Sequence, residues 1–150
     1  MSRDEVMRLL GAQKTGALAT IDKEGFPHQA AMWFISEPGH ILMWTYRRSQ
    51  KAVNLRRDRR ASFMVEDGET YDTLRGVLVQ GEVELMDNLE RVLDIGLQLN
   101  RRYALSAGAD VRGFEAAIQR QAARRVGVVL PMSRVVSWDH RKLMLPERGR

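Results

Sequence analysis

The sequence contains no cysteine, and that absence removes several kinds of chemistry at once. Disulfide bonds, thiolate nucleophiles and zinc-thiolate centres all need the sulfur of cysteine. A small secreted fold held together by disulfides is therefore excluded, and so are cofactors bound through sulfur.

Long apolar runs are also missing. No stretch approaches the roughly 18 consecutive apolar residues that a membrane-spanning helix needs. The first ten residues, MSRDEVMRLL, carry an acidic pair where a secretory signal would be basic and then apolar. The sequence therefore predicts a cytoplasmic protein without a membrane partner.

Common catalytic and nucleotide-binding motifs are absent as well. Neither GxGxxG nor GxxxxGKS/T occurs, so the glycine-rich phosphate loops are lacking. There is no GxSxG elbow, and His28, His40 and His140 show no metal-ligand spacing. A metal site and covalent hydrolysis are disfavoured, and His28 is the one histidine kept as a functional candidate.

What the sequence does contain is typical of one globular domain. Its 150 residues are 44% hydrophobic and 29% charged, which is ordinary for a folded chain and atypical of a disordered one. This length allows one main core but not two full domains. We expect a single domain over residues 1–150.

The first part of the chain is rich in extended patterns. The pair Ser2 and Glu5 has capping-box spacing and predicts a short opening helix. Alternation predicts a hairpin from residues 16–21 and 26–35, and a third strand over 41–46 completes a meander. Ser49 is expected to cap a short surface helix with too few apolar positions for deep burial.

Further strands and a helical pair follow. A fourth strand is predicted over residues 61–66, and the clearest alternation predicts a long strand over 77–85. Asp87 and Glu90 repeat the capping pattern ahead of a helix that continues to Tyr103, and a second helix spans about 111–123. Strands over 126–130, 135–138 and 142–145 close a mainly β, α+β fold, which we predict to be a small barrel with helices across an opening.

The net charge of +5 is concentrated in one segment. Residues 47–60 hold seven basic residues and one acidic residue, whereas the other 136 residues sum to −1. Such a concentration indicates a specific anionic partner rather than general affinity for polyanions.

Within this segment, Arg47, Ser49 and Lys51 stand at the start of a helix that directly follows a strand. Helix N-terminal amides favour an anion, Ser49 adds a hydroxyl donor, and the two cations add charge. The pattern favours a phosphate site, with a solvated basic helix and a nucleic-acid-binding helix as alternatives. The second cluster, Arg56 to Arg60, is expected to stay solvated.

Four stretches, taken in order and spacing, carry a resemblance to a known family. They are GALATIDKEGFPHQAAMWF, SQKAVNLRRDRRASFMVE, LRGVLVQGEVELM and SRVVSWDHRKL. They resemble the first hairpin, the phosphate-binding helix with its following strand, the next long strand and the closing strands of the flavin and deazaflavin oxidoreductases related to pyridoxamine phosphate oxidase. The resemblance covers nearly the whole chain and implies a split β-barrel of the FMN-binding type, with flanking helices.

The resemblance also implies where a cofactor lies. Members of this family are usually homodimers that bind a tricyclic cofactor between subunits, with its phosphate on the helix that starts at Ser49. The second hairpin strand borders the ring and the end of the third strand forms the floor, where alternation turns either Met43 or Trp44 inward. The implied cofactor-binding residues are His28, Gln29, Ala30, Ala31, Met32, Met43, Trp44, Thr45, Arg47, Ser49, Gln50, Lys51 and Arg75.

Departures from the family pattern separate its branches. FMN-dependent pyridoxamine phosphate oxidases carry a phosphate-gripping arginine on the second hairpin strand, where this chain has the uncharged run AAMWF. They have a strand glutamine at the place of Gly76, and their terminal substrate motif is replaced here by WDHR. Retention of Ser49 and Lys51 resembles the branch that uses coenzyme F420, whose phosphate and oligoglutamate tail require cations, and arginines 47, 48, 56 and 57 are available for that tail.

The sequence therefore predicts a homodimeric, coenzyme F420-dependent oxidoreductase that transfers hydride from the reduced deazaflavin to a small organic acceptor. His28, Tyr71 and Arg75 are candidates for substrate contact, and no side chain is assigned as the proton donor. The alternatives are an FMN-dependent oxidoreductase of the same fold and a non-catalytic module that binds a cofactor or nucleic acid. We expect that the protein has no nucleic-acid partner.

Overall fold

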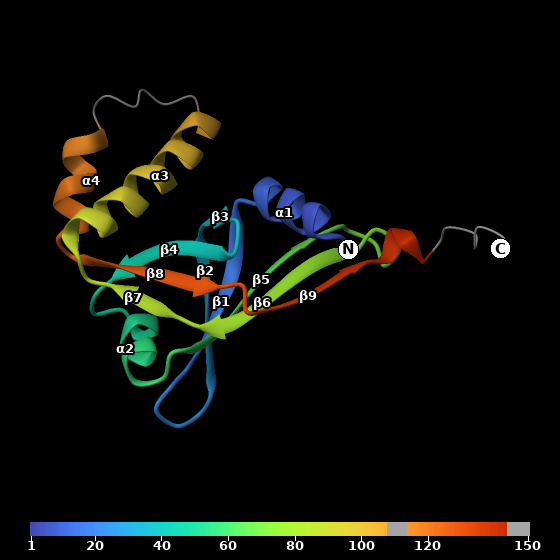
Figure 1. Ribbon diagram of the computed structural model, residues 1–150, viewed down its shortest axis with the longest axis horizontal. Helices are drawn as coiled ribbons and strands as arrows, with labels where there is room; N and C mark the ends of the chain where they lie inside the picture. The colour runs from blue at the N-terminus through green and yellow to red at the C-terminus, as the bar shows by residue number, and fades with distance from the viewer. Residues whose placement is uncertain (108–113, 144–150) are drawn as a thin grey trace.

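Two antiparallel sheets enclose a common core, as the computed structural model in Figure 1 shows. The structure describes residues 1–107 and 114–143. One sheet has the strand order β2-β1-β5-β6-β9 and the other the order β3-β4-β8-β7. The α+β class predicted from the sequence is confirmed.

The bounds of the elements follow the chain between the two sheets. The five-stranded sheet contains β1 (Thr15–Ile21), β2 (Pro27–Trp33), β5 (Arg60–Asp67), β6 (Arg75–Glu82) and β9 (Arg134–Asp139). The four-stranded sheet contains β3 (Ile35–Glu37), β4 (His40–Tyr46), β7 (Glu84–Met86) and β8 (Arg125–Pro131). The helices are α1 (Arg3–Ala12), α2 (Gln50–Arg57), α3 (Leu89–Ala107), α4 (Phe114–Ala122) and a 3-10 helix over His140–Lys142.

The predicted three-stranded meander is wrong, because the chain changes sheets at Phe34. β2 ends at Trp33, and the next strand, β3, pairs with β4 in the other sheet. Phe34 is fully buried, its ring packs edge-on against Phe63 at 4.9 Å, and its N–H donates to the Tyr103 hydroxyl at 3.0 Å. Burying this ring between the sheets, with its amide satisfied by α3, ends the pairing with β1.

The long strand predicted over residues 77–85 breaks in the same manner at Val83. β6 pairs with β5 and β9, whereas β7 pairs with β8 in the second sheet. Val83 is buried and its N–H donates to the Arg59 carbonyl at 2.8 Å, so the residue between the two strands remains satisfied. The apolar alternation is therefore real, but it spans two sheets.

Both ends of the described chain meet beside α1. Ser2 and Glu5 form the predicted capping box, and Lys142 donates to Glu5 at 2.8 Å. The strand predicted over 142–145 is wrong at residues 142 and 143, because Lys142 ends a 3-10 helix. Residues 144 and 145 lie outside the described ranges.

Helices α3 and α4 lie together over β4 and β8 (Figure 1). Asp87 does not cap α3 as predicted, because the Asn88 side chain accepts the hydrogen bond from Arg91 N–H at 3.1 Å. The predicted start of the second helix, residues 111–113, lies outside the described ranges. No helix in those ranges has the length and apolar content that crossing a bilayer requires.

Helix α2 is seated more deeply than the sequence predicts. Ala52, Leu55 and the polar Asn54 are all fully buried, while Val53 is 47% exposed. Asn54 Nδ2 donates to Thr20 Oγ1 at 3.0 Å, and Gln50 Nε2 donates to Asn54 Oδ1 at 2.8 Å. The prediction counted only apolar positions, whereas a buried amide with satisfied hydrogen bonds also holds a helix against a sheet.

Substituting this amide tests its contribution to stability. Asn54→Ala removes both hydrogen bonds and leaves the Thr20 hydroxyl without its buried donor, so we expect a loss of about 1–3 kcal/mol in the free energy of unfolding. Val53→Ala, on the exposed face of the same helix, is the matched control and should change stability by about 0.5 kcal/mol or less. Urea denaturation of both variants measures the difference, and equal losses would contradict the assignment.

Candidate functional site

The N-terminus of α2 is open to an anion. Ser49 caps the helix, its Oγ accepting from Ala52 N–H at 3.4 Å and lying 3.1 Å from Thr45 Oγ1. The backbone N–H groups of Gln50 and Lys51 have no hydrogen-bond partner among the described residues. Two donors and the positive end of the helix dipole thus face outward at one point.

Lys51 adds a cation to this helix end without a neutralising partner. Its side chain is partly buried, and burial first, then the charge of Arg125, lower the pKa of Lys51 from its ordinary value. No carboxylate in the described ranges forms an ion pair with it. An anion bound here would restore the pKa and satisfy the helix amides together.

Arg47, by contrast, already has a counter-charge. Its guanidinium forms an ion pair with the Asp87 carboxylate and also donates to the Asp87 carbonyl at 3.4 Å. Arg56 Nη1 folds back to donate to the Arg47 carbonyl at 2.7 Å, and Arg57 donates to the Ile21 carbonyl. The predicted cations are therefore unequal: Arg47 has a carboxylate partner, whereas Lys51 is partly buried without one.

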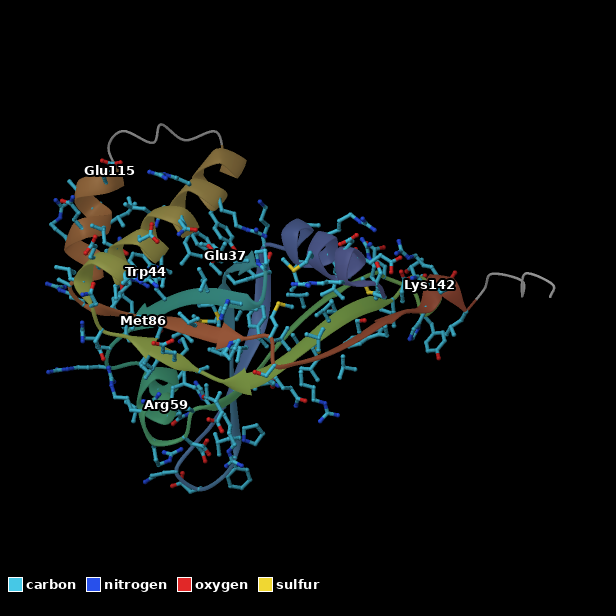
Figure 2. All side chains as sticks on the ribbon, viewed as in Figure 1. Glu37, Trp44, Arg59, Met86, Glu115 and Lys142 are labelled. Atoms are coloured by element: carbon cyan, nitrogen blue, oxygen red, sulfur yellow. The ribbon has the colours of Figure 1, made fainter. Side chains whose placement is uncertain are left out.

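The end of β4 contacts the start of this helix through Thr45. Met43 is fully buried in the core and Trp44 points to the opposite face, which resolves the alternation left open by the sequence. Figure 2 shows Trp44 between β4 and α3, where a side chain at Gly96 would collide with its indole. Thr45 is buried and aligns Ser49 through the hydroxyl contact.

A hydrogen-bond chain joins the helix to the strand predicted to border a ring. Gln50 donates to Asn54, Asn54 to Thr20, and Thr20 Oγ1 to the His28 carbonyl at 3.4 Å. β2 lies at the edge of its sheet, with Ala30 and Met32 turned toward the core and Gln29 and Ala31 exposed. The structure thus connects the predicted residues of β2 and α2.

Arg75, the remaining predicted cofactor-binding residue, lies at the start of β6 and not beside α2. It pairs with Asp67 at 2.9 and 2.5 Å at the start of β6, whereas the end of α2 leads into the Arg60 end of β5. Arg60 lies opposite Glu82, seven positions along β6 from Arg75, which is roughly 23 Å at about 3.3 Å per residue. Arg75 is therefore far from the Arg60 end of β5, and no hydrogen bond or ion pair among the described residues joins it to Lys51.

A second polar cluster surrounds Arg75. His140 Nδ1 lies 2.7 Å from the Tyr71 carbonyl oxygen, and the two rings are 4.6 Å apart. Trp138 lies against Gly76, so closely that a side chain at position 76 would collide with the indole. The cluster contains the WDHR motif, which the sequence offered only as a departure from the family pattern.

Concave surface also exists away from both clusters. A hollow of about 690 Å³ lies across β1, β5 and β6 and includes Arg60, Gln80 and Arg134, but none of the thirteen predicted cofactor-binding residues lines it. The described ranges contain no group of three or more histidine or acidic residues placed to hold a metal ion. The Lys51 site therefore lies outside this hollow.

The outer face of the five-stranded sheet carries a continuous apolar row. Directly paired residues share a face of a sheet, and one such set crosses all five strands. Met64 is 38% exposed and Val136 is 41% exposed. The row consists of Ala31, Ala17, Met64, Leu78 and Val136.

Comparison with known proteins relates this architecture to flavin-binding folds. The sequence profile of the family described as pyridoxamine 5'-phosphate oxidase matches residues 2–139. A conserved hypothetical protein from Mycobacterium tuberculosis is 42% identical, with a TM-score of 0.87 over 100% of this chain and 92% of that chain. No curated protein matches.

Two more distant structures share the fold. An F420 reductase is 24% identical, with a TM-score of 0.68 over 86% of this chain and 94% of that chain. A FAD-binding protein from Mesorhizobium loti is 21% identical, with a TM-score of 0.62 over 91% and 94% of the two chains. The two sheets and their helices therefore form the split barrel of flavin-binding proteins, as predicted.

The second cluster has a measurable electrostatic signature. Hydrogen bonds from Arg141 to Asp139, whose side chain is 3% exposed, lower the pKa of Asp139 from 3.8 to about 2. The lowered pKa stabilises the fold above pH 3.8, and this contribution disappears as the pH falls through about 2. Arg141→Gln should raise the pKa of Asp139 and lower stability at neutral pH, with the difference from wild type vanishing in acid.

Carboxyl-carbon NMR titration measures this shift. Arg60→Gln is the matched control, because Arg60 lowers the pKa of Asp58 to about 2 in the same local arrangement. That control should raise the pKa of Asp58 and leave the pKa of Asp139 unchanged. An unchanged Asp139 titration in Arg141→Gln would refute the pairing.

Proposed function

The chain belongs to the pyridoxamine 5'-phosphate oxidase family, and we propose that it is a coenzyme F420-dependent oxidoreductase that transfers hydride to a small organic acceptor. The observation that carries this proposal is the uncompensated Lys51 at the open N-terminus of α2. An FMN-dependent enzyme of the same fold is the competing hypothesis.

The residues at this helix end fit a phosphate group. The free amides of Gln50 and Lys51 supply hydrogen bonds, and the Lys51 ammonium supplies charge at a partly buried position. Ser49 is fixed by Thr45, so its orientation does not depend on a ligand. Phosphate binding here suits both FMN and F420.

The distribution of the other cations favours F420. The exposed Ala31 and its neighbours on β2 provide no charge for a second grip on an FMN phosphate. Arg56 folds back toward the start of α2, and Arg48 is exposed beside it. Guanidinium groups placed around the helix suit a longer tail bearing several carboxylates.

The bound deazaflavin would supply the hydride, and the protein's part is binding, orientation and exclusion of water. Lys51 and the α2 amides hold the anionic end. The Gln50–Asn54–Thr20 chain fixes the β2 backbone at His28 relative to that end. This coupling would fix β2, the strand expected to border the ring, relative to the residues that would hold the phosphate.

We further propose that the protein is one domain that acts as a homodimer, with a second copy covering the outer face of the five-stranded sheet. The apolar row centred on Met64 would otherwise remain in water. A second copy would also bring another Arg75 cluster, which one chain keeps apart from its own Lys51.

The dimer is tested by sedimentation of the wild type and of Met64→Arg. We expect wild-type dimers at micromolar concentration and a shift toward monomer in the variant, because the new charge would be buried in the interface. Phe26→Arg replaces an apolar side chain that is 69% exposed in the β1–β2 turn, and should remain dimeric. A monomeric wild type would overturn the proposal.

The cofactor site is tested by Lys51→Ala. Loss of one charge-assisted contact should reduce F420 affinity about tenfold to hundredfold, with little change in stability. Arg59→Ala is the control, because Arg59 is exposed beyond the end of α2 (Figure 2) and contributes only long-range attraction. Equal losses in both variants would indicate a diffuse field instead of a localised site.

Parallel titrations of the wild type with F420 and FMN distinguish the two cofactors. Tighter F420 binding supports the proposal, and tighter FMN binding supports the competing hypothesis. If neither cofactor binds, the proposed function is wrong.

A further inference from the structure

Arg125 occupies an unusual position at the start of β8. Its guanidinium carbon lies 4.3 Å from the centre of the Trp44 ring and 4.2 Å from that of the Tyr46 ring. Tyr46 is its direct partner in the β4–β8 ladder, and Trp44 is two residues earlier on the same face. Both aromatic rings hold the planar cation through cation–π contacts.

Within residues 1–107 and 114–143, no anion compensates this charge. Arg125 Nη2 donates to the neutral amide of Gln121 at 3.0 Å, and its buried Nε has no hydrogen-bond partner in the described ranges. The ion pairs found in those ranges do not include Arg125. Burial lowers the pKa of Arg125 from its ordinary value, as expected for a cation that has lost water without gaining a carboxylate.

The backbone places Arg125 beside the N-terminus of α2. Arg47 N–H donates to the Arg124 carbonyl at 3.0 Å, and Ser49 N–H donates to the Tyr46 carbonyl at 3.0 Å. The turn that caps α2 is therefore built directly on the strand end that pairs with Arg125. The charge of Arg125 reaches Lys51, whose pKa it helps to lower.

We propose that Arg125 is a second anion-binding residue of the cofactor site, contacting the acidic end of the cofactor that Lys51 and the α2 amides hold. This inference rests on the proposed function and identifies a residue that the sequence analysis did not assign. Two uncompensated cations held close together repel each other, and a shared anionic ligand removes that repulsion. Trp44 acts in this site through Arg125, by fixing the plane of the guanidinium.

Arg125→Gln tests the contact with two ligands that differ in charge. F420 affinity should fall about tenfold to hundredfold, the range for losing a charge-assisted hydrogen bond. Affinity for the deazaflavin that carries only its ribityl chain, and so lacks the phosphate and the glutamates, should change less than about twofold, the size of a marginal contact. Equal losses for both ligands would show that Arg125 only supports the structure, and would overturn the inference.

Arg124→Gln is the matched control. Arg124 is the neighbouring residue and is exposed, so its removal changes the net charge equally without touching the aromatic pair. We expect F420 affinity to stay within about twofold of the wild type, since an exposed charge is screened by salt. A loss as large as that of Arg125→Gln would assign the effect to net charge and contradict a specific contact.

A readout on the ligand-free protein separates this inference from the proposed function. Arg125→Gln should raise the pKa of Lys51 toward its ordinary value, which NMR of the lysine side chain measures. An unchanged pKa would overturn the pairing of the two cations. If wild type binds F420 and Arg125→Gln binds it equally well, only this inference fails; if wild type binds neither F420 nor FMN, the proposed function fails and the inference fails with it.

Discussion

The buried amide of Asn54 is the contact on which the arrangement of the site depends. It joins α2, which presents the free amides and Lys51, to β1, and through the Thr20 hydroxyl to the backbone of β2. Apolar packing alone is tolerant of small sliding movements, whereas a buried amide with fixed partners permits few alternatives. The anion-binding helix and the strand beside it are therefore positioned by the same hydrogen bonds, and a displacement of one is transmitted to the other.

The cations of the basic segment, residues 47–60, differ in whether a carboxylate neutralises them. Arg47 is neutralised by Asp87 and Arg60 by Asp58, and the folded-back Arg56 meets a carbonyl. Lys51 has no such partner, and burial first, then the charge of a second cation, Arg125, lower its pKa. Within this segment, Lys51 therefore combines partial burial with the lack of a carboxylate partner, at the end of α2 where the helix amides are free. A partly buried cation beside free helix amides is what distinguishes a phosphate site from a generally basic surface.

Local patterns in the sequence predicted the elements well and their partners less well. The capping residues Ser2 and Ser49 and the alternation in β5 are determined by neighbours in the chain, so sequence alone reveals them. The changes of sheet at Phe34 and Val83 are determined by distant contacts that alternation does not encode, since a strand reads the same whichever sheet it joins. Arg125 was missed for a similar reason, because its aromatic partners are about eighty positions away in the sequence and only the β4–β8 register brings them together.

The contact between Gly76 and Trp138 has a consequence for how members of this family diverge. Position 76 on β6 and position 138 on β9 face each other across the ladder, and the indole fills the volume that any side chain at 76 would need. A glutamine at position 76 would therefore require the Trp138 indole to move from its present position. A side chain at position 76 is accommodated only if the indole rotates away or position 138 carries a smaller residue, so a change at Gly76 of this chain affects the packing of β9 as well as β6.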